Sequence, residues 1–190
     1  MVGTDPLEVD RLLAGGGLRC PGCGGELRPW GHARERGVRG EAEVVRVRPR
    51  RSSCSRCGST HVLLPVFTLV RRADAVAVIG GALLAKARGS GHRGIAGLLG
   101  RPVSTVRGWL RRFGARAGDL RVLFTGLLAA LDASAAAVTV TGSVFADALE
   151  VLGLAAAAAA RLLGPRPAWE FASAASGGQL LGRGLAANTS

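Results

Sequence analysis

Residues 93–112, which read RGIAGLLGRPVSTVRGWLRR, decide the fold of the central part of the chain. Ala96 is small enough to lie where two helices cross, and Gly100 can adopt the left-handed backbone that a tight turn requires. Val106 follows six residues later and offers a β-branched side chain for packing against the first helix. This spacing predicts a helix-turn-helix over residues 92–114. Its small core is predicted to contain Ile95, Leu99, Val106, Trp109 and Leu110.

The predicted packing leaves one side of the second helix exposed. In a DNA-binding helix-turn-helix, the N-terminal part of this helix enters the major groove. Arg107 is the first candidate for a base contact, because a guanidinium can donate two hydrogen bonds to guanine. The other candidates suit bases near the helix start or phosphates beside it. The full predicted set is Arg101, Val103, Ser104, Thr105, Arg107, Arg111 and Arg112. A plain helical hairpin with solvated arginines is the alternative.

Two Cys-x-x-Cys pairs, each followed by glycine, lie ahead of this segment with thirty residues between them. Two residues between thiolates allow a tight turn to direct both sulfurs at one ion, and four thiolates form the structural site that Zn²⁺ accepts. The pattern predicts structural zinc bound by Cys20, Cys23, Cys54 and Cys57. Disulfides or free thiols are the alternative, although a reducing cytosol disfavours disulfides. His61, four residues after Cys57, stays open as a competing ligand.

A small β-hairpin is expected to connect the two cysteine pairs. Glu43 to Arg48 is rich in valine and favours a strand, with Leu27 to Trp30 as its candidate partner. Such a small ribbon would take much of its folding free energy from the metal ion. The arginines that run along the strand into the second cysteine pair would contact phosphate, or would only solvate an edge. They are Arg46, Arg48, Arg50 and Arg51.

The fold class predicted for the chain is mainly α, with a small four-cysteine zinc ribbon followed by a helical domain containing the helix-turn-helix. Asp74 is a plausible N-cap for a supporting helix over 74–87, and Ser104 for the second helix of the motif. Further helices are expected near 119–131, over 144–163 and after Pro167, and the last residues are expected to fray. The predicted divisions are a flexible lead-in at 1–17, the ribbon at 18–66, a helical domain at 67–117 and an alanine-rich helical tail at 118–190.

Charge is distributed unevenly along the 190 residues, whose net charge is +12. Residues 1–117 contain 21 basic and 8 acidic side chains, a balance of +13, whereas the remainder carries −1. A clustered positive field favours a polyanion such as double-stranded DNA. Genome bias explains why Lys86 is the only lysine, but it does not explain why the positive charge stops near residue 117.

Neither a targeting segment nor a membrane partner is expected. The first twenty residues carry three acidic side chains and have no apolar core. The charge-free stretch Ala133 to Ala146 has 14 residues, too few for a bilayer span. We expect a cytoplasmic, nucleoid-associated protein with no evident small-molecule substrate. The helical tail would either pair two copies as a homodimer or cover the core of the helix-turn-helix.

The chain resembles an uncharacterised actinobacterial helix-turn-helix family, a domain of unknown function. The carrying segments are Cys20 to Cys23, Leu27 to His32, Arg48 to Arg51, Thr60 to Pro65, Arg71 to Val76 and Ser104 to Arg112, and Trp169 to Leu181 is also similar. The order of cysteine pairs and helix-turn-helix is similar to the N-terminal, DNA-binding part of some insertion-sequence transposases. The resemblance implies DNA binding linked to mobile elements or to transcription, and it implies no established activity.

The preferred function is sequence-specific binding of double-stranded DNA, as a transposition-associated factor or a transcriptional regulator, and not an enzyme. A truncated or accessory transposase with catalytic activity is one alternative. Metal-dependent cleavage of DNA would need several carboxylates that converge on the metal ions. The tail offers Asp119, Asp132, Asp147, Glu150 and Glu170 without a strand-rich scaffold. A protein-interaction adaptor that docks through the ribbon is the other alternative.

Overall fold

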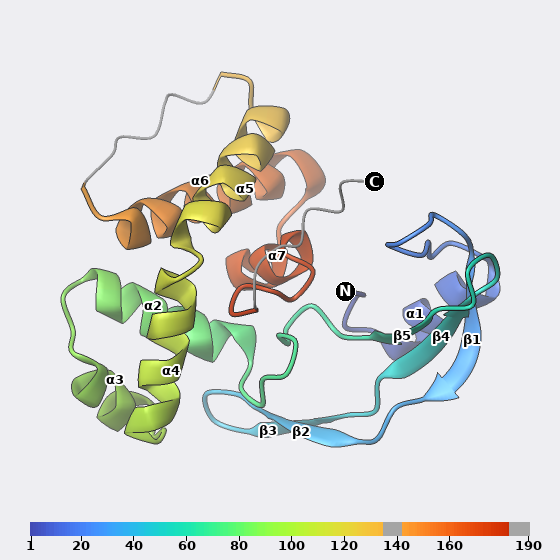
Figure 1. Cartoon of the computed structure of the whole chain (residues 1–190), viewed down its shortest axis with the longest axis horizontal. Helices are drawn as coiled ribbons and strands as arrows, with labels where there is room; N and C mark the ends of the chain where they lie inside the picture. The colour runs from blue at the N-terminus through green and yellow to red at the C-terminus, as the bar shows by residue number, and fades with distance from the viewer. Residues whose placement is uncertain (135–141, 183–190) are drawn as a thin grey trace.

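The computed structural model describes residues 1–134 and 142–182, and Figure 1 shows their arrangement. A β-rich N-terminal part lies beside a helical part. The N-terminal part contains α1 (Pro6–Ala14), β1 (Leu27–His32), β2 (Arg36–Arg39), β3 (Val44–Val47), β4 (Arg50–Cys54) and β5 (Thr60–Leu63). The helical part contains α2 (Val76–Ala87), α3 (His92–Leu99), α4 (Val103–Gly114), α5 (Ala117–Leu131), α6 (Val144–Leu163) and α7 (Ala168–Ala175).

The strands form two small antiparallel sheets, ordered β1-β4-β5 and β2-β3. The strand expected over 43–48 is β3, but its expected partner was wrong. It pairs with β2, because the amide of Gly40 donates to the carbonyl of Glu43 (2.7 Å) and closes a local hairpin. The segment from Leu27 pairs instead with β4, in a register that places Leu27 opposite Cys54. This long-range pairing brings the two cysteine pairs together.

The flexible lead-in predicted at 1–17 was also wrong, because α1 occupies much of it. The Asp5 carboxylate accepts a hydrogen bond from the amide of Leu7 (2.9 Å), and Pro6 occupies the first helical position. Val9 and Leu13 lie one helical turn apart and are buried against the sheet residues Leu27 and Leu63. The amphipathic face of α1 therefore completes the small core of the β-rich part.

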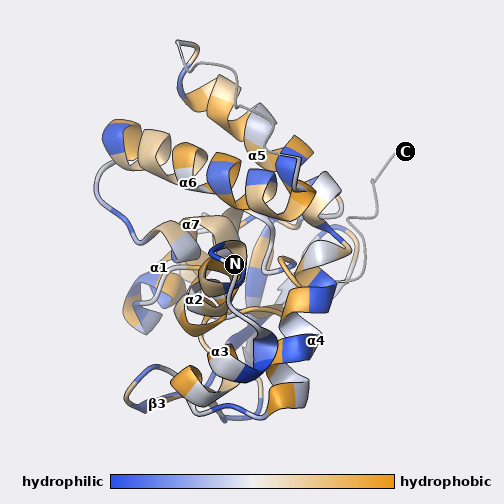
Figure 2. Ribbon diagram, turned by 90° about the vertical axis from the view of Figure 1, so that its left-hand side faces the viewer, coloured by the Kyte–Doolittle hydropathy of each residue, from blue (hydrophilic) through white to orange (hydrophobic). Residues whose placement is uncertain are grey.

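The two-helix segment predicted from residues 93–112 is present as α3 and α4. Gly100 has φ +59° and ends α3 in the left-handed conformation, as its position in the turn required. Ile95, Ala96, Val106 and Trp109 are buried, and Leu99 and Leu110 pack against the same core. Figure 2 shows hydrophilic segments along α4, whereas α2 is largely hydrophobic.

The two predicted N-caps were wrong. The residue preceding α2 is Ala75, which gives no side-chain cap, because the Asp74 carboxylate is occupied by arginines. The residue preceding α4 is Pro102, so Ser104 already lies in the helix. The fixed φ of Pro102 (−55°) starts α4 two residues earlier than a serine cap would.

The alanine-rich helices α5, α6 and α7 share one hydrophobic core with α2–α4, which runs from Leu69 to Leu181. The rings of Phe113 in α4 and Phe145 in α6 meet edge to face, with centroids 4.8 Å apart. A domain division at residue 117 would therefore cross this core. The small side chains of α6 pack inside the chain rather than on its surface, chiefly Ala148, Ala155, Ala156, Ala158 and Ala159.

The end that was expected to fray, 183–190, and most of the charge-free stretch before α6, 135–141, lie outside the described residues. None of the helices in the described part of the chain has both the length and the apolar character needed to cross a bilayer.

Candidate metal centre and nucleic-acid interface

The four cysteines converge at one end of the β1-β4-β5 sheet. Cys20 and Cys23 lie in the turn before β1, Cys54 ends β4, and Cys57 lies in the turn that leads to β5. Their Sγ atoms all lie within 4.8 Å of one another, and none forms a disulfide. The Sγ distances are 3.8 Å between Cys20 and Cys57 and 3.4 Å between Cys23 and Cys54. A tetrahedral site with bonds of about 2.3 Å has sulfur–sulfur edges of about 3.8 Å, so the cluster can hold one metal ion.

Each cysteine pair forms the same tight turn. The amide of Gly24 donates to the carbonyl of Cys20 (2.9 Å), and the amide of Gly58 donates to that of Cys54 (3.0 Å). Both glycines have positive φ, +70° and +71°, which explains why glycine follows each pair. The Cys54 sulfur also accepts hydrogen bonds from the amides of Arg56 (3.4 Å) and Cys57 (3.5 Å). These amides favour the thiolate, which is the form that binds metal.

The local hydrogen bonds separate the thiol pKa values. The hydroxyl and amide of Ser59 lower the pKa of Cys57 to about 6. The amide of Cys57 lowers the pKa of Cys54 below its usual value. The amide of Gly25 lowers the pKa of Cys23, but the neighbouring sulfurs of Cys54 and Cys57 outweigh it and raise that pKa to about 12. A thiol with a pKa raised this far keeps its proton at neutral pH, so binding of a metal ion at Cys23 would release that proton.

Two further residues lie beside the cluster: His61, whose role as a metal ligand the sequence left open, and Gly25, which the sequence analysis did not single out. His61 in β5 lies outside the four-sulfur group, with Nε2 3.4 Å from the sulfur of Cys20. A ring N–H in that position would donate to a metal-bound thiolate. Gly25 packs directly on the cluster, since an added Cβ would lie 2.7 Å from the Cβ of Arg56 and 2.9 Å from the sulfur of Cys54. Two glycines, Gly24 and Gly25, follow the first cysteine pair, and this second glycine was the only sign in the sequence of the close packing at Gly25.

Gly25→Ala is expected to lower the affinity for Zn²⁺ by about tenfold or more, because the methyl group pushes Arg56 and Cys54 out of position. Competition with a chromophoric chelator measures this change. Gly22→Ala is the matched control, since its added Cβ would meet only the sulfur of Cys20, at 3.9 Å. Equal affinities for the two variants would contradict the close packing at Gly25.

A basic face lies on α4. Val103, Arg107 and Arg111, spaced four residues apart, are exposed along one side of the helix, together with Ser104 and Arg112. Thr105 is partly buried. Among the described residues, no carboxylate pairs with Arg107 or Arg111. This face is therefore free to meet an anionic partner.

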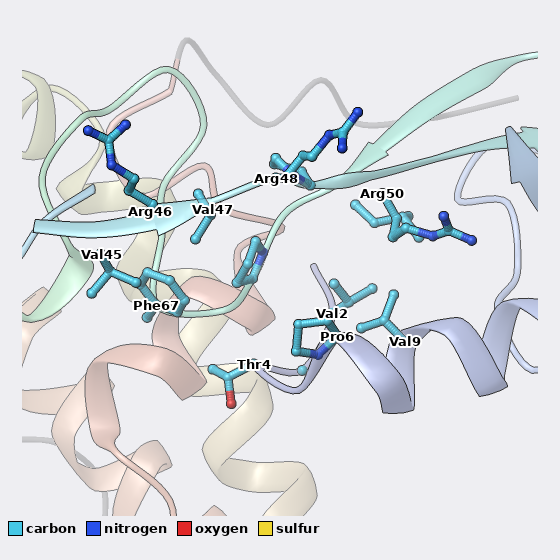
Figure 3. A pocket seen from close by; sticks show the side chains of 14 residues that line it. Val2, Thr4, Pro6, Val9, Val45, Arg46, Val47, Arg48, Arg50 and Phe67 are labelled. Carbon is cyan, nitrogen blue, oxygen red and sulfur yellow. The ribbon is translucent and has the colours of Figure 1, made fainter. Parts of the chain in front are cut away.

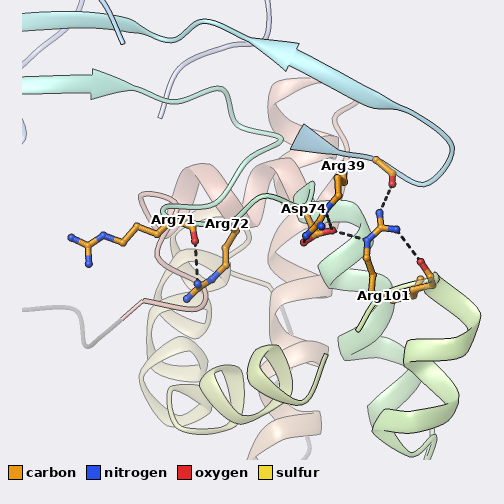
Figure 4. Close-up of polar contacts among 7 residues, drawn as sticks. Arg39, Arg71, Arg72, Asp74 and Arg101 are labelled. Atoms are coloured by element: carbon orange, nitrogen blue, oxygen red, sulfur yellow. Dashed lines mark hydrogen bonds and ion pairs between the residues drawn. The ribbon is translucent and has the colours of Figure 1, made fainter. Parts of the chain in front are cut away.

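Arg101, which the sequence placed in the same set, does not lie on that face, because its side chain is occupied inside the chain. Its guanidinium donates to Asp74 Oδ1 (2.7 Å) and to the carbonyls of Leu99 (3.1 Å) and Gly40 (2.9 Å), as Figure 4 shows. Only 15% of its side chain is exposed. The cause is Asp74, whose side chain is 3% exposed, because a buried carboxylate is stabilised by hydrogen bonds from cationic partners.

Asp74 connects the β-rich part to the helical part. Arg39 at the end of β2 forms a bidentate pair with it, with distances of 3.0 and 2.7 Å. The backbone follows the same path, because the amide of Arg39 donates to the carbonyl of Ala73 and the amide of Ala75 donates to that of Arg39. The β2–β3 hairpin is therefore fixed against the start of α2 and the turn between α3 and α4.

The predicted ribbon arginines fall into two groups. Arg46 and Arg48 are exposed and project to the same side of β3, as predicted (Figure 3). They point away from an apolar hollow of about 210 Å³ between β3 and α1. Arg46 pairs with the exposed Glu35 (3.2 Å). Such an exposed pair contributes little and leaves Arg46 free to exchange partners.

Arg50 and Arg51 are less accessible than predicted. Pro49 separates β3 from β4, and the chain there enters the other sheet. Arg50 turns to α1, where Nε lies 2.6 Å from Asp10 Oδ1 and 21% of the side chain is exposed. Arg51 is half-buried within β4. The sequence analysis placed all four arginines along one strand. This prediction was wrong, because the chain passes from one sheet to the other at Pro49.

The acidic residues considered for catalysis do not form a metal-binding group. Asp132 pairs with Arg161 (2.8 Å), and Asp147 is buried at the start of α6. In the described ranges, the four cysteines form the one group of metal-ligand side chains.

Comparisons with protein-family models, with curated proteins and with solved structures find no match to this chain. The resemblance to an actinobacterial helix-turn-helix family therefore stays a prediction.

Proposed function

We propose that the chain is a sequence-specific double-stranded DNA-binding protein, acting on chromosomal DNA as a transposition-associated factor or a transcriptional regulator. In this proposal α3 and α4 are a helix-turn-helix, and the cysteine cluster with its strands is a zinc ribbon. The exposed arginine face on α4, beside a helix crossing at Ala96 and a left-handed turn at Gly100, is the observation that carries the proposal.

Each part of the proposed site has a separate task. Arg107 lies near the N-terminal part of α4 and would donate two hydrogen bonds to a guanine edge. Ser104 and Thr105 would meet bases or phosphates at the helix start, and Arg111 and Arg112 would contact phosphates. Arg46 and Arg48 would extend the contact to the neighbouring backbone.

The metal ion would act on structure rather than on chemistry. Four thiolates leave no open coordination position, so Zn²⁺ bound here would supply folding free energy to the ribbon. The ribbon core otherwise consists of a few aliphatic side chains, chiefly Val2, Val9, Leu13, Leu27 and Leu63. The Arg39–Asp74–Arg101 contact would then transmit a fixed orientation from the ribbon to α4.

Arg107→Ala is expected to cost about 1–3 kcal/mol at one base position and to relax sequence preference there. Selection of bound sequences from random duplexes, run in parallel for the wild type and the variant, measures this. Arg48→Ala is the matched comparison, and it should weaken binding to all sequences similarly because its expected partner is phosphate. If Arg107→Ala retains both affinity and base preference, α4 is not the recognition helix.

A further inference from the structure

A second basic site lies at the C-terminal end of α4. A cavity of about 730 Å³ opens between α4, the segment before α2 and the turn after α7. Its described wall contains five arginines and no acidic residue, and the rest of that wall is apolar or amide. The five are Arg71, Arg72, Arg111, Arg112 and Arg116. Five guanidiniums with no carboxylate between them repel one another until an anion is present.

Arg116 is the strongest sign that the cavity takes a ligand. Its residue is 3% exposed, and its Nη1 donates to the carbonyl of Gln179. Its Nε and Nη2 are buried and have no partner in the described part of the chain. A buried guanidinium with free donors is costly unless an anion accepts from it.

Arg72 repeats this pattern on the opposite wall. It donates to the carbonyls of Arg71 and Leu181, both at 3.1 Å, and its buried Nε is left without a partner among the described residues. Burial lowers the pKa of Arg72, and the positive charge of Arg112 lowers it further. Burial also lowers the pKa of Arg116, although Asp119 acts in the opposite direction. The lowered pKa of each group means that neighbouring acceptors and carboxylates compensate its buried positive charge only in part.

The backbone supports the same interpretation at Arg71, which has φ +59° (Figure 4 shows Arg71 beside Arg72). Arg71 is the only non-glycine residue with positive φ among the described residues. Left-handed backbone is unfavourable for a residue with a long side chain, and it recurs at ligand-binding loops. The strained residue places one arginine at the rim and the next one in the wall.

A smaller hollow of about 230 Å³ adjoins this cavity and shares three of its arginines. It extends to Ser104 and Thr105 at the start of α4. The arginine cavity is therefore continuous with the face proposed to meet DNA.

We propose that the arginine cavity binds phosphate groups, two or more at a time, supplied by consecutive backbone phosphates of DNA or by the pyrophosphate group of a free nucleotide. A guanidinium donates paired hydrogen bonds to phosphate oxygens. A single carboxylate has too few acceptor sites for the donors of five guanidiniums. The cavity is large enough for a diphosphate with part of its ester. Arg116 is buried in the wall of the cavity, Arg72 is half-buried there, and Arg71 and Arg112 are exposed at its rim.

The test uses the full, zinc-loaded chain with two probes, inorganic pyrophosphate by calorimetry and random duplex DNA by fluorescence anisotropy. The rim variant Arg71→Gly is chosen because this side chain is exposed, is not among the proposed DNA contacts of α4, and Gly accepts the backbone at 71. This variant should weaken the binding of at least one probe by about tenfold. Arg88→Ala, an exposed arginine at the end of α2, is the charge-matched control and should leave both affinities near wild type.

The two arms identify the source of the phosphate. Loss of pyrophosphate binding with unchanged DNA binding assigns the cavity to a free nucleotide-type ligand. Loss of DNA affinity, with pyrophosphate competing against DNA, assigns it to the duplex backbone. Equal affinities of the rim variant and Arg88→Ala for both probes would overturn the proposal. Pyrophosphate binding by a chain that ignores duplex DNA would support the cavity while refuting the DNA-binding function.

Discussion

Cys54→Ser is expected to abolish binding of the metal ion and to unfold the β-rich part while the helical part stays folded. Cys54 ends β4, lies opposite Leu27, and accepts two amide hydrogen bonds at its sulfur, so its loss removes a ligand and a core residue together. Structural zinc contributes about 10–16 kcal/mol of apparent binding free energy in small zinc domains, which exceeds what the few aliphatic residues of this core supply. Zinc stoichiometry and amide chemical-shift dispersion measure both effects.

Ser55→Ala is the control for that variant. Ser55 is the neighbouring residue, its hydroxyl donates to the carbonyl of Glu26 at the surface (3.2 Å), and it is not a metal ligand. It should retain one zinc ion per chain and wild-type dispersion. A Cys54→Ser protein that keeps one tightly bound zinc and a folded ribbon would contradict the four-thiolate site.

Asp74→Ala is expected to lower the free energy of unfolding by about 3–5 kcal/mol, because it leaves the partly buried guanidiniums of Arg39 and Arg101 without their carboxylate. It should also loosen the β2–β3 hairpin from the turn before α4, since Arg101 alone bridges Asp74 and the carbonyl of Gly40. Urea unfolding measures the first effect, and amide hydrogen exchange over residues 36–47 measures the second.

Asp132→Ala gives the matched comparison for this buried pair. Asp132 also pairs with an arginine, at 2.8 Å from Arg161, but both side chains reach solvent. Its loss should cost about 0–1 kcal/mol. If the two substitutions destabilise the chain equally, Asp74 does not hold the two parts together.

Features with a local signal were predicted well from the sequence. Gly100 and Ala96 located the helix crossing because backbone freedom and small size are intrinsic to those residues. The helix over 144–163 was predicted with its observed bounds, since Ser143 caps it and glycine follows it. The cysteine pairs predicted their own convergence because each pair requires the same turn.

Features that depend on partners distant in the chain were missed. Arg39 and Asp74 are 35 residues apart, and neither differs in sequence from a solvated surface residue. Arg101 was predicted to contact phosphate because Asp74, its partner in the structure, was predicted to cap a helix instead. Arg116 was not singled out, because its partner Gln179, in the turn after α7, lies 63 residues further along the chain. The packing of α1 was missed because the sheet residues that its buried face contacts, Leu27 and Leu63, lie far along the chain.

In the proposed function, a metal-held ribbon and α4 together present arginines to duplex DNA. The most direct measurement is selection of bound sequences from random duplexes with the zinc-loaded protein, repeated after zinc is removed with a chelator. We expect one enriched motif at low and moderate salt, lost or strongly weakened by the chelator, with the affinity for DNA falling as salt rises. A purified protein that contains no zinc and does not bind duplex DNA, even at low salt, would contradict the proposed function.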